Sequence, residues 1–212
     1  MSGPIEPIRG WRWQFPGSHH HRWRDVVSPL QAGVKTAVHW VATCEFPIEE
    51  KVQELPSVGK VMCTVFWDRK GVILPDFLEP GQTINSDRYI ATLTKLKARI
   101  SRVRSEKKTT FLLQHDVRPH TSLKTVEHIA NLGWTVLPHP PYSPDLAPFD
   151  FHLFGPMKVG LRAQHFTSND AVIWAVKQWA TSAGADFYEC GMQALVHRWR
   201  KCIANSGDYV EK

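Results

Sequence analysis

The chain has 212 residues, of which 42% are hydrophobic and 22% charged, so it has the length and composition of one globular domain with a core. No apolar run approaches the roughly 18 residues of a membrane span and no signal peptide opens the chain, so we expect no membrane partner. The formal net charge of +6 suits a polyanion such as DNA without establishing it as a partner.

The first fifty residues differ from the rest of the chain. Residues 1–50 show no sustained period of helix or strand, so we expect a poorly ordered segment there. Residues 51–212 carry regular signals and are expected to form the folded domain. Within the first segment, residues 36–46 are apolar enough to form a single strand.

A hairpin and a helix are the first regular elements. Two β-rich runs, Val61–Trp67 and Val72–Leu78, flank a turn with the sequence Asp-Arg-Lys-Gly, which predicts a β-hairpin. Ser86 is the expected N-cap of the helix that follows. The apolar residues of this helix recur every three or four positions, at Ile90, Leu93, Leu96, Ile100 and Val103.

A buried strand and a second helix come next. Thr109–Gln114 has an apolar centre, as expected of a strand covered on both faces. We expect Thr121 to cap a helix that Gly133 ends, since glycine favours the backbone conformation found just after helices. Trp134–Leu137 is predicted to be a short strand.

The last third of the chain is a proline-rich loop followed by helices. Five prolines lie in residues 138–148, which predicts a rigid loop, and a helix is expected from Asp150. Two further helices are predicted over about 168–182 and 187–204. A hairpin followed by alternating helices and strands predicts an α/β fold with a mixed sheet flanked by helices.

Two carboxylates mark a candidate site. Asp116 follows the buried strand and Asp150 ends the proline-rich loop, and sites in α/β sheets form beyond the carboxyl ends of the strands. Two carboxylates that meet there repel each other unless divalent cations lie between them, and such ions cleave phosphodiesters. The alternative is purely structural, with one aspartate that ends a strand and one that caps a helix.

The sequences around these aspartates are distinctive. The runs LQHDVRPH (residues 113–120) and PHPPYSPDLAPFDFHLF (residues 138–154) resemble the two diagnostic blocks of mariner-type DNA transposases, in the Tc1/mariner superfamily. The resemblance covers about residues 52–212. Shorter matches are Gly59-Lys60-Val61-Met62, Phe66-Trp67-Asp68 and Arg198-Trp199-Arg200-Lys201-Cys202.

The resemblance implies an RNase H-like catalytic domain, in which aspartates bind Mg²⁺ or Mn²⁺ and transposon ends are cut and transferred. It identifies Asp116 as the second of the family's aspartates and Asp150 as the third. Two local departures accompany them. Val117 stands in place of the family's Asn-Ala pair, and Phe149 in place of a small serine. Errors of about 1 Å in the position of a catalytic group can cost ~100-fold in rate.

The family's first aspartate is missing. It lies on the opening strand in a GDETW-like run, and no such run occurs in this chain, so we expect the authentic first strand to be absent. Residues 36–46 could fill its place as a surrogate strand. Asp25 and Glu45 are the candidate surrogates for a third metal ligand, although neither lies in the motif.

A shifted reading frame could explain the loss. Residues 24–50, read with a shift of one base, allow codons for a string that is similar to mariner sequence. In that frame, glycine would stand where the family has aspartate. We therefore hypothesise that the first fifty residues are an out-of-frame translation of transposase DNA, which the nucleotide sequence of the locus tests directly.

DNA is the expected partner, and the nucleus the expected location. The chain begins too late for the family's paired helix-turn-helix domain, so we expect non-specific, salt-sensitive binding to phosphates. The candidate contacts are Lys95, Arg99, Arg102, Arg104, Lys107 and Lys108, although a solvated helix face is an equal interpretation. A homodimer or a complex with a related transposase is also expected.

Three functional hypotheses follow. The first is a transposase remnant without catalytic activity. The second is a domesticated protein that binds DNA or another transposase without catalysis. The third is a residual endonuclease dependent on Mg²⁺ or Mn²⁺, and the sequence leaves open whether the protein is an enzyme.

Overall fold

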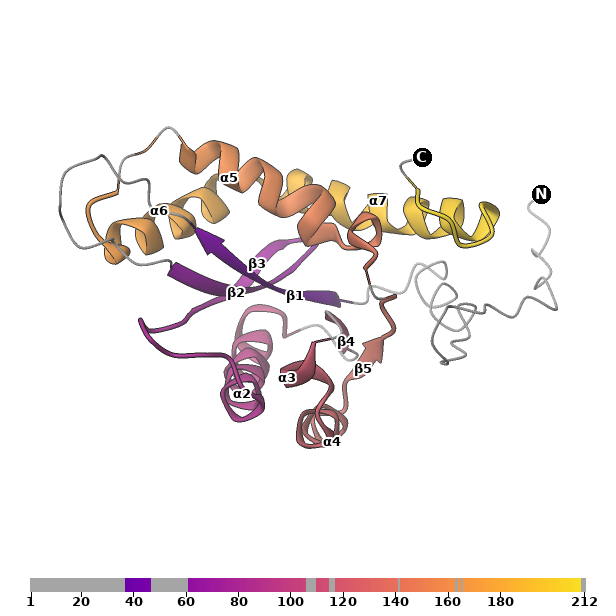
Figure 1. The fold of residues 1–212 in the computed structure, drawn as a ribbon, viewed down its shortest axis with the longest axis horizontal. Coiled ribbons are helices and arrows are strands. Elements are labelled where there is room, and N and C mark those ends of the chain that lie inside the picture. The colour runs from indigo at the N-terminus through magenta and orange to yellow at the C-terminus, as the bar shows by residue number, and fades with distance from the viewer. Residues whose placement is uncertain are drawn as a thin grey trace. The chain divides into compact units, whose positions relative to one another are not determined.

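A five-stranded mixed sheet with helices on both faces forms the centre of the fold (Figure 1). The structure is a computed structural model that describes residues 37–46, 61–105, 110–114, 117–140, 142–162, 164 and 166–210. The strands are β1 (Ala37–Phe46), β2 (Val61–Asp68), β3 (Gly71–Phe77), β4 (Thr110–Gln114) and β5 (Thr135–Leu137), in the order β3-β2-β1-β4-β5. The α/β fold predicted from the sequence is thereby confirmed.

Strand β1 is the middle strand of the sheet. It pairs antiparallel with β2, with Trp40 opposite Trp67, and parallel with β4, with Val41 opposite Gln114. The prediction of a strand over residues 36–46 is therefore confirmed. Part of the segment that was expected to be poorly ordered thus lies where pairing on both sides contributes most to a sheet.

The hairpin of β2 and β3 forms as predicted. Its turn closes through Gly71, whose φ of 124° is open only to glycine at low cost, and the Lys70 amide donates to Asp68 Oδ1 over 2.9 Å. The register shifts between Phe66 and Trp67, and each ring is 0% exposed because the sheet is covered on both faces: Phe66 lies in the cluster with α2 (Ser86–Val103), whereas Trp67 packs against Tyr188.

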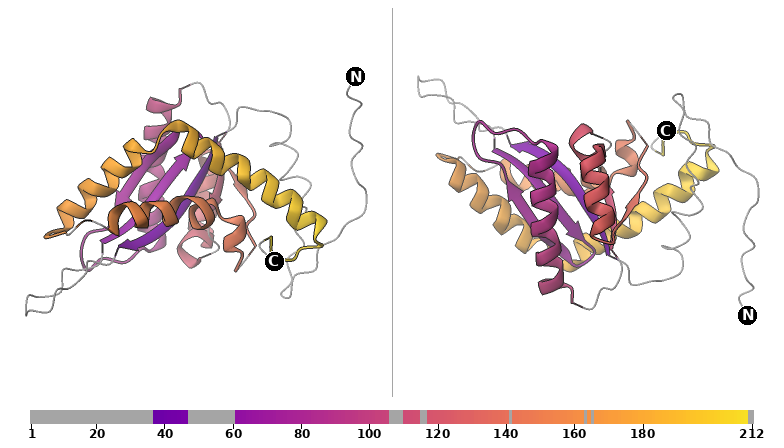
Figure 2. Two further views of the ribbon diagram at one scale, coloured as in Figure 1. Left: turned by 90° about the horizontal axis from the view of Figure 1, so that it is seen from above. Right: turned by 90° about the horizontal axis from the view of Figure 1, so that it is seen from below.

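Two layers of helices cover the sheet (Figure 2). One layer holds α2 (Ser86–Val103), α3 (Arg118–Thr121) and α4 (Leu123–Asn131). The other holds α5 (Phe154–Arg162), α6 (Asn169–Ser182) and α7 (Ala185–Ala204). Because helices pack on both faces, β2 is buried along almost its whole length, and its sequence is mostly apolar, with Thr64 and Asp68 as its polar residues.

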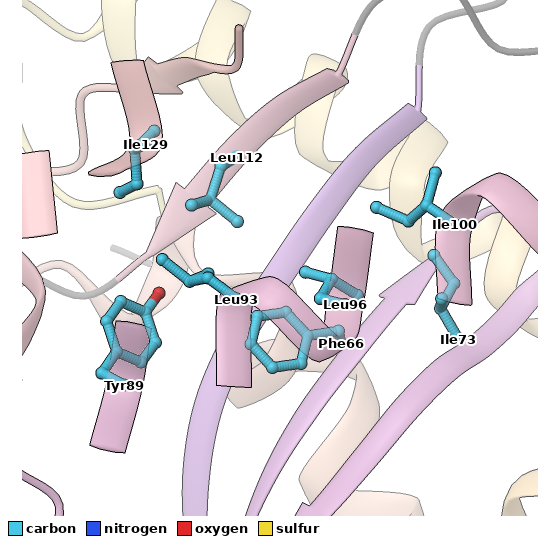
Figure 3. Packing of buried hydrophobic residues seen from close by; sticks show 8 residues of the cluster. All are labelled: Phe66, Ile73, Tyr89, Leu93, Leu96, Ile100, Leu112 and Ile129. Atoms are coloured by element: carbon cyan, nitrogen blue, oxygen red, sulfur yellow. The ribbon is translucent and has the colours of Figure 1, made fainter. Parts of the chain in front are cut away.

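The apolar face of α2 packs onto the sheet to form the core shown in Figure 3. Leu93, Leu96 and Ile100 contribute at the predicted spacing, and Tyr89 takes the place predicted for Ile90 at the start of this face. The cluster consists of Phe66, Ile73, Tyr89, Leu93, Leu96, Ile100, Leu112 and Ile129.

Both predicted helix caps are wrong by one residue. Asn85, not Ser86, caps α2, because its extended backbone lets the side-chain oxygen accept from the Arg88 amide over 2.8 Å. Ser122, not Thr121, caps α4, since a short helix ends at Thr121 and the chain must become extended before the next helix begins. Gly133 does end α4, with a φ of 72°.

The predicted helix at Asp150 begins differently. The proline-rich loop contains a single 3₁₀ turn, Pro144–Leu146, and residues Phe149–Leu153 then form a π-helical turn that leads into α5. π turns of this kind are rare and occur often at functional sites. No described helix is both long and apolar enough to cross a membrane.

Candidate active site

The π turn Phe149–Leu153, called here the Asp150 turn, presents a carboxylate between buried neighbours. Phe149 and Leu153 are at most 1% exposed, whereas Asp150 is exposed. The carbonyl of Ala147 accepts from the amides of Asp150 (2.8 Å) and Phe151 (3.1 Å). The buried flanks therefore anchor the turn and leave the Asp150 side chain at the surface. The Phe149 ring packs against Phe154, with ring centroids 6.0 Å apart.

The carboxylate of Asp150 is partly desolvated by its surroundings. Desolvation raises the pKa of Asp150 to about 6, while the positive charge of Lys158 acts in the opposite direction. Although the side chain is exposed, its carboxylate therefore keeps only part of its hydration. A cation beside the carboxylate would stabilise its charged form, as the charge of Lys158 already does in part.

The turn that carries Asp150 lies next to the central strand. The Asp150 turn contacts β1, although the two segments are separated by more than a hundred residues. The backbone of Glu45 pairs with Met62 near the end of β1. Two other predicted ligands, Asp116 and Asp25, lie outside the described residues.

The described residues do not complete a metal site. Among them, no three His, Cys, Asp or Glu side chains gather closely enough to hold an ion. Asp150 is the one described side chain of the predicted ligand set, and its desolvated carboxylate fits a hard divalent cation, which prefers oxygen ligands.

The predicted basic residues of α2 mostly contact the protein itself. Lys95 Nζ lies 3.3 Å from Asp76, and Arg99 Nε donates to the Ile73 carbonyl over 3.3 Å. Lys107 and Lys108 lie outside the described residues. Arg102 is exposed.

Arg104 is the most firmly engaged of these basic residues. Its Nε and Nη2 donate to the two oxygens of Asp68, each over 3.0 Å, and the Asp68 side chain is 1% exposed. This bidentate ion pair connects the end of α2 to the start of the hairpin turn. Its guanidinium therefore has a structural partner in the fold.

Two side chains that hold the Asp150 turn, Arg198 beside it and His152 within it, were not singled out from the sequence. Arg198 of α7 donates to the Asp145 carbonyl over 3.1 Å, and His152 Nε2 lies 2.7 Å from the Phe187 carbonyl. Arg198 stands in a family-like run, but sequence spacing does not place that run beside Asp150. The packing of α7 against the loop brings the two together.

Comparisons with known proteins give consistent matches. Residues 34–110 match the family model described as transposase (partial DDE domain), so the match begins ahead of residue 50. The chain is 38% identical over 156 residues to the Mariner Mos1 transposase of Drosophila mauritiana, which covers 72% of this chain and 45% of the relative. It is 35% identical over 155 residues to the human histone-lysine N-methyltransferase SETMAR, covering 72% of this chain and 23% of the relative.

The fold agrees with a solved structure of the Mos1 transposase. The crystal structure of the Mos1 catalytic domain aligns with a TM-score of 0.79 and 31% identity, over 88% of this chain and 90% of that domain. Other matching structures contain that domain with Mg or Mn, or the transposase in a paired-end complex with the left transposon end. The chain spans less than half of the length of either curated relative.

Proposed function

Because this chain belongs to the mariner-type DNA transposases, of which it forms an RNase H-like catalytic domain, we propose that it is a transposase-derived protein with an incomplete active site. In this proposal it binds DNA and a divalent cation, without appreciable strand cleavage. Since DNA is its partner, it acts in the nucleus.

The composition of β1 carries this proposal. This strand takes the central place in the sheet, where the family has its first aspartate, and its single acidic residue is Glu45. Glutamate is one methylene longer than aspartate, so even at the backbone position of the family's aspartate its carboxylate would be displaced by more than a catalytic group tolerates. A displacement of about 1 Å can lower the rate of an oriented reaction ~100-fold.

Asp150 and Asp116 are the proposed ligands of the cation. The desolvation of Asp150 supports this role, since an adjacent cation would offset the cost of its charge. When bound, Mg²⁺ or Mn²⁺ would activate water and stabilise the leaving oxygen of a phosphodiester. The solved structures of the Mos1 domain with Mg and Mn support the choice of metal.

DNA contact is proposed through phosphates. Arg102, which is exposed, and the pair Lys107 and Lys108 are the first candidates, with Lys95 and Arg99 free to exchange their contacts with the protein for contacts with DNA. Arg104 is the weakest candidate because of its ion pair with Asp68. Such binding should fall steeply with salt.

The proposal also covers the oligomeric state of the protein and the origin of its first fifty residues. The paired-end complex of Mos1 supports a dimer, or a complex with a related transposase, as the DNA-bound form. The out-of-frame origin is proposed for the first fifty residues, which the family match overlaps from residue 34 onward. Sequencing of the locus and analytical ultracentrifugation with DNA test these two points.

A residual endonuclease is the second candidate function. The observation that favours it is the contact between β1, which carries Glu45, and the Asp150 turn. In this case Glu45, rather than Asp25, would supply the third carboxylate. Cleavage would then be slow, because the longer side chain must fold back to reach the ions.

A nicking assay separates the two candidates. Supercoiled plasmid is incubated with the protein in Mn²⁺ or Mg²⁺, alongside the variants Asp150→Asn, Asp116→Ala and Glu45→Gln. Asp170→Asn is the matched control, since this exposed aspartate lies in the first turn of α6. If the wild-type protein and the control nick the plasmid and all three site variants do not, the protein is an endonuclease. That result would overturn the proposal that its active site is inactive.

A filter-binding assay tests the DNA-binding part separately. We expect salt-sensitive retention of duplex DNA with little dependence on sequence. Protein that retains no DNA even at low salt would refute this part of the proposal.

A further inference from the structure

Helix α7 and the residues after it form several contacts with the loop that leads to Asp150. The Asp145 side chain is buried, and its Oδ2 accepts from the Val210 amide over 2.8 Å. The Tyr209 hydroxyl donates to the Tyr142 carbonyl over 3.1 Å. Residues more than sixty positions apart are therefore tied together just before the Asp150 turn.

Arg198 reaches both sides of Asp150. Its Nη1 donates to the Asp145 carbonyl, five residues before Asp150, over 3.1 Å. Its guanidinium also lies over the ring of Phe151, the next residue, with 4.2 Å between the guanidinium carbon and the ring centroid. One planar side chain therefore holds the backbone before the turn and the ring that follows Asp150.

The start of α7 holds the other side of the turn. The His152 ring stacks on Phe187, with centroids 4.3 Å apart, and its Nε2 lies 2.7 Å from the Phe187 carbonyl. Gly191 makes room for this ring, because a Cβ at that position would lie only 2.9 Å from His152 Cγ and closer still to Cδ2. A larger residue at position 191 would push the ring away.

These contacts matter because a metal ligand must be placed to within a few tenths of an ångström. The Asp150 turn is a π turn, a rare conformation that here receives contacts from outside the turn. External contacts at residues 145, 151 and 152 leave it little freedom to rotate.

We propose that Arg198 is a positioning residue, which orients the Asp150 carboxylate for a divalent cation by fixing the Asp145 carbonyl and the Phe151 ring. The role of the cation rests on the function proposed above. The role of Arg198 in ordering the turn does not, so the two are tested by different measurements.

The first measurement is amide hydrogen exchange in the full-length protein without metal. Arg198→Met should raise the exchange rates of the Asp150 and Phe151 amides about tenfold, the equivalent of one hydrogen bond to a charged group. Arg200→Met is the matched control, because this arginine lies two residues further along α7 and is exposed. Equal exchange in the two variants would overturn the proposal.

The second measurement is Mn²⁺ affinity, followed by electron paramagnetic resonance. We expect Arg198→Met to weaken binding by about 10- to 100-fold, as found for residues that orient metal ligands, and Arg200→Met to leave it unchanged. The proposed metal site is wrong if the wild-type protein binds no Mn²⁺, or if Asp150→Asn binds Mn²⁺ as tightly as the wild type. Hydrogen exchange alone then decides the role of Arg198.

Two further variants keep the test decisive if Arg198→Met does not fold. Arg198→Lys retains the charge but cannot both bond the carbonyl and lie flat on the ring, so we expect a partial effect in both measurements. Gly191→Ala leaves Arg198 intact and should raise exchange at Asp150 by displacing His152. Wild-type exchange in both variants would refute the positioning of the turn by α7.

Discussion

The ion pair between Asp68 and Arg104 offers the sharpest test of how this fold is held together. Arg104→Met removes the guanidinium while retaining most of the apolar stem. The Asp68 carboxylate, whose side chain is 1% exposed, then loses two hydrogen bonds of 3.0 Å and keeps the one from the Lys70 amide. The substitution therefore removes from a buried carboxylate the guanidinium that is paired with it.

The cost follows from this burial. Removal of one partner from a buried ion pair lowers the free energy of unfolding by about 3–5 kcal/mol. For a domain of this size, about 1 kcal/mol shifts the melting temperature by about 2–4 °C, so Arg104→Met should lower it by roughly 6–20 °C. Arg102→Met, on the exposed side of the same helix end, should change the free energy of unfolding by less than about 0.5 kcal/mol.

Urea denaturation followed by tryptophan fluorescence measures both variants. The double variant Asp68→Leu/Arg104→Met should recover much of the loss, because no buried charge remains. An Arg104→Met protein as stable as Arg102→Met would refute the assignment of Arg104 to the interior. In that case, Arg104 would again be a candidate for DNA binding. The salt dependence of DNA retention, compared between the two variants, would test this role.

Three further predictions concern Asp150, a helix cap and a helix contact. Because desolvation raises the pKa of Asp150 from 3.8 to about 6, the folded state binds its proton more tightly, so stability should fall as pH rises through this window. Asp150→Asn should flatten this dependence in pH-resolved denaturation, and an unchanged profile would contradict it. Asn85→Ala should cost about 0.5–2 kcal/mol of unfolding free energy and Ser86→Ala much less, and the reverse order in thermal melts would restore Ser86 as the cap. Gly160→Ala would place a Cβ 2.7 Å from the Trp179 ring, so calorimetry should show a loss of about 1–3 kcal/mol, and no loss would mean that α5 and α6 shift freely.

The order and type of most elements could be predicted from local pattern. The apolar spacing along α2, the turn before Gly71 and the end of α4 at Gly133 depend on neighbours in sequence, and they are confirmed except that Tyr89 is buried in place of Ile90. The helix caps failed at Asn85 and Ser122, because several residues near each helix start can cap it and only backbone geometry decides among them.

The site was predictable only in part. The family-like runs mark Asp116 and Asp150 by their sequence alone, and their assignment as metal ligands stays a prediction. The pattern could not indicate that Arg104 pairs with Asp68, or that Arg198 reaches the Asp150 turn. Both contacts join residues at least thirty-six positions apart, and a charged residue on a helix looks the same in sequence whether it contacts solvent, DNA or a buried carboxylate.

The amino-acid sequence by itself determined the fold class, the family and the two marked aspartates. These depend on hydrophobic periodicity and on short sequence motifs, which can be recognised without knowing any tertiary contact. Tertiary structure decided the rest. It placed the apolar stretch Ala37–Phe46 at the centre of the sheet, it committed Arg104 to the interior, and it brought α7 against the Asp150 turn. The physical reason is that burial and pairing belong to the folded arrangement, in which distant residues compete for the same space and the same hydrogen bonds.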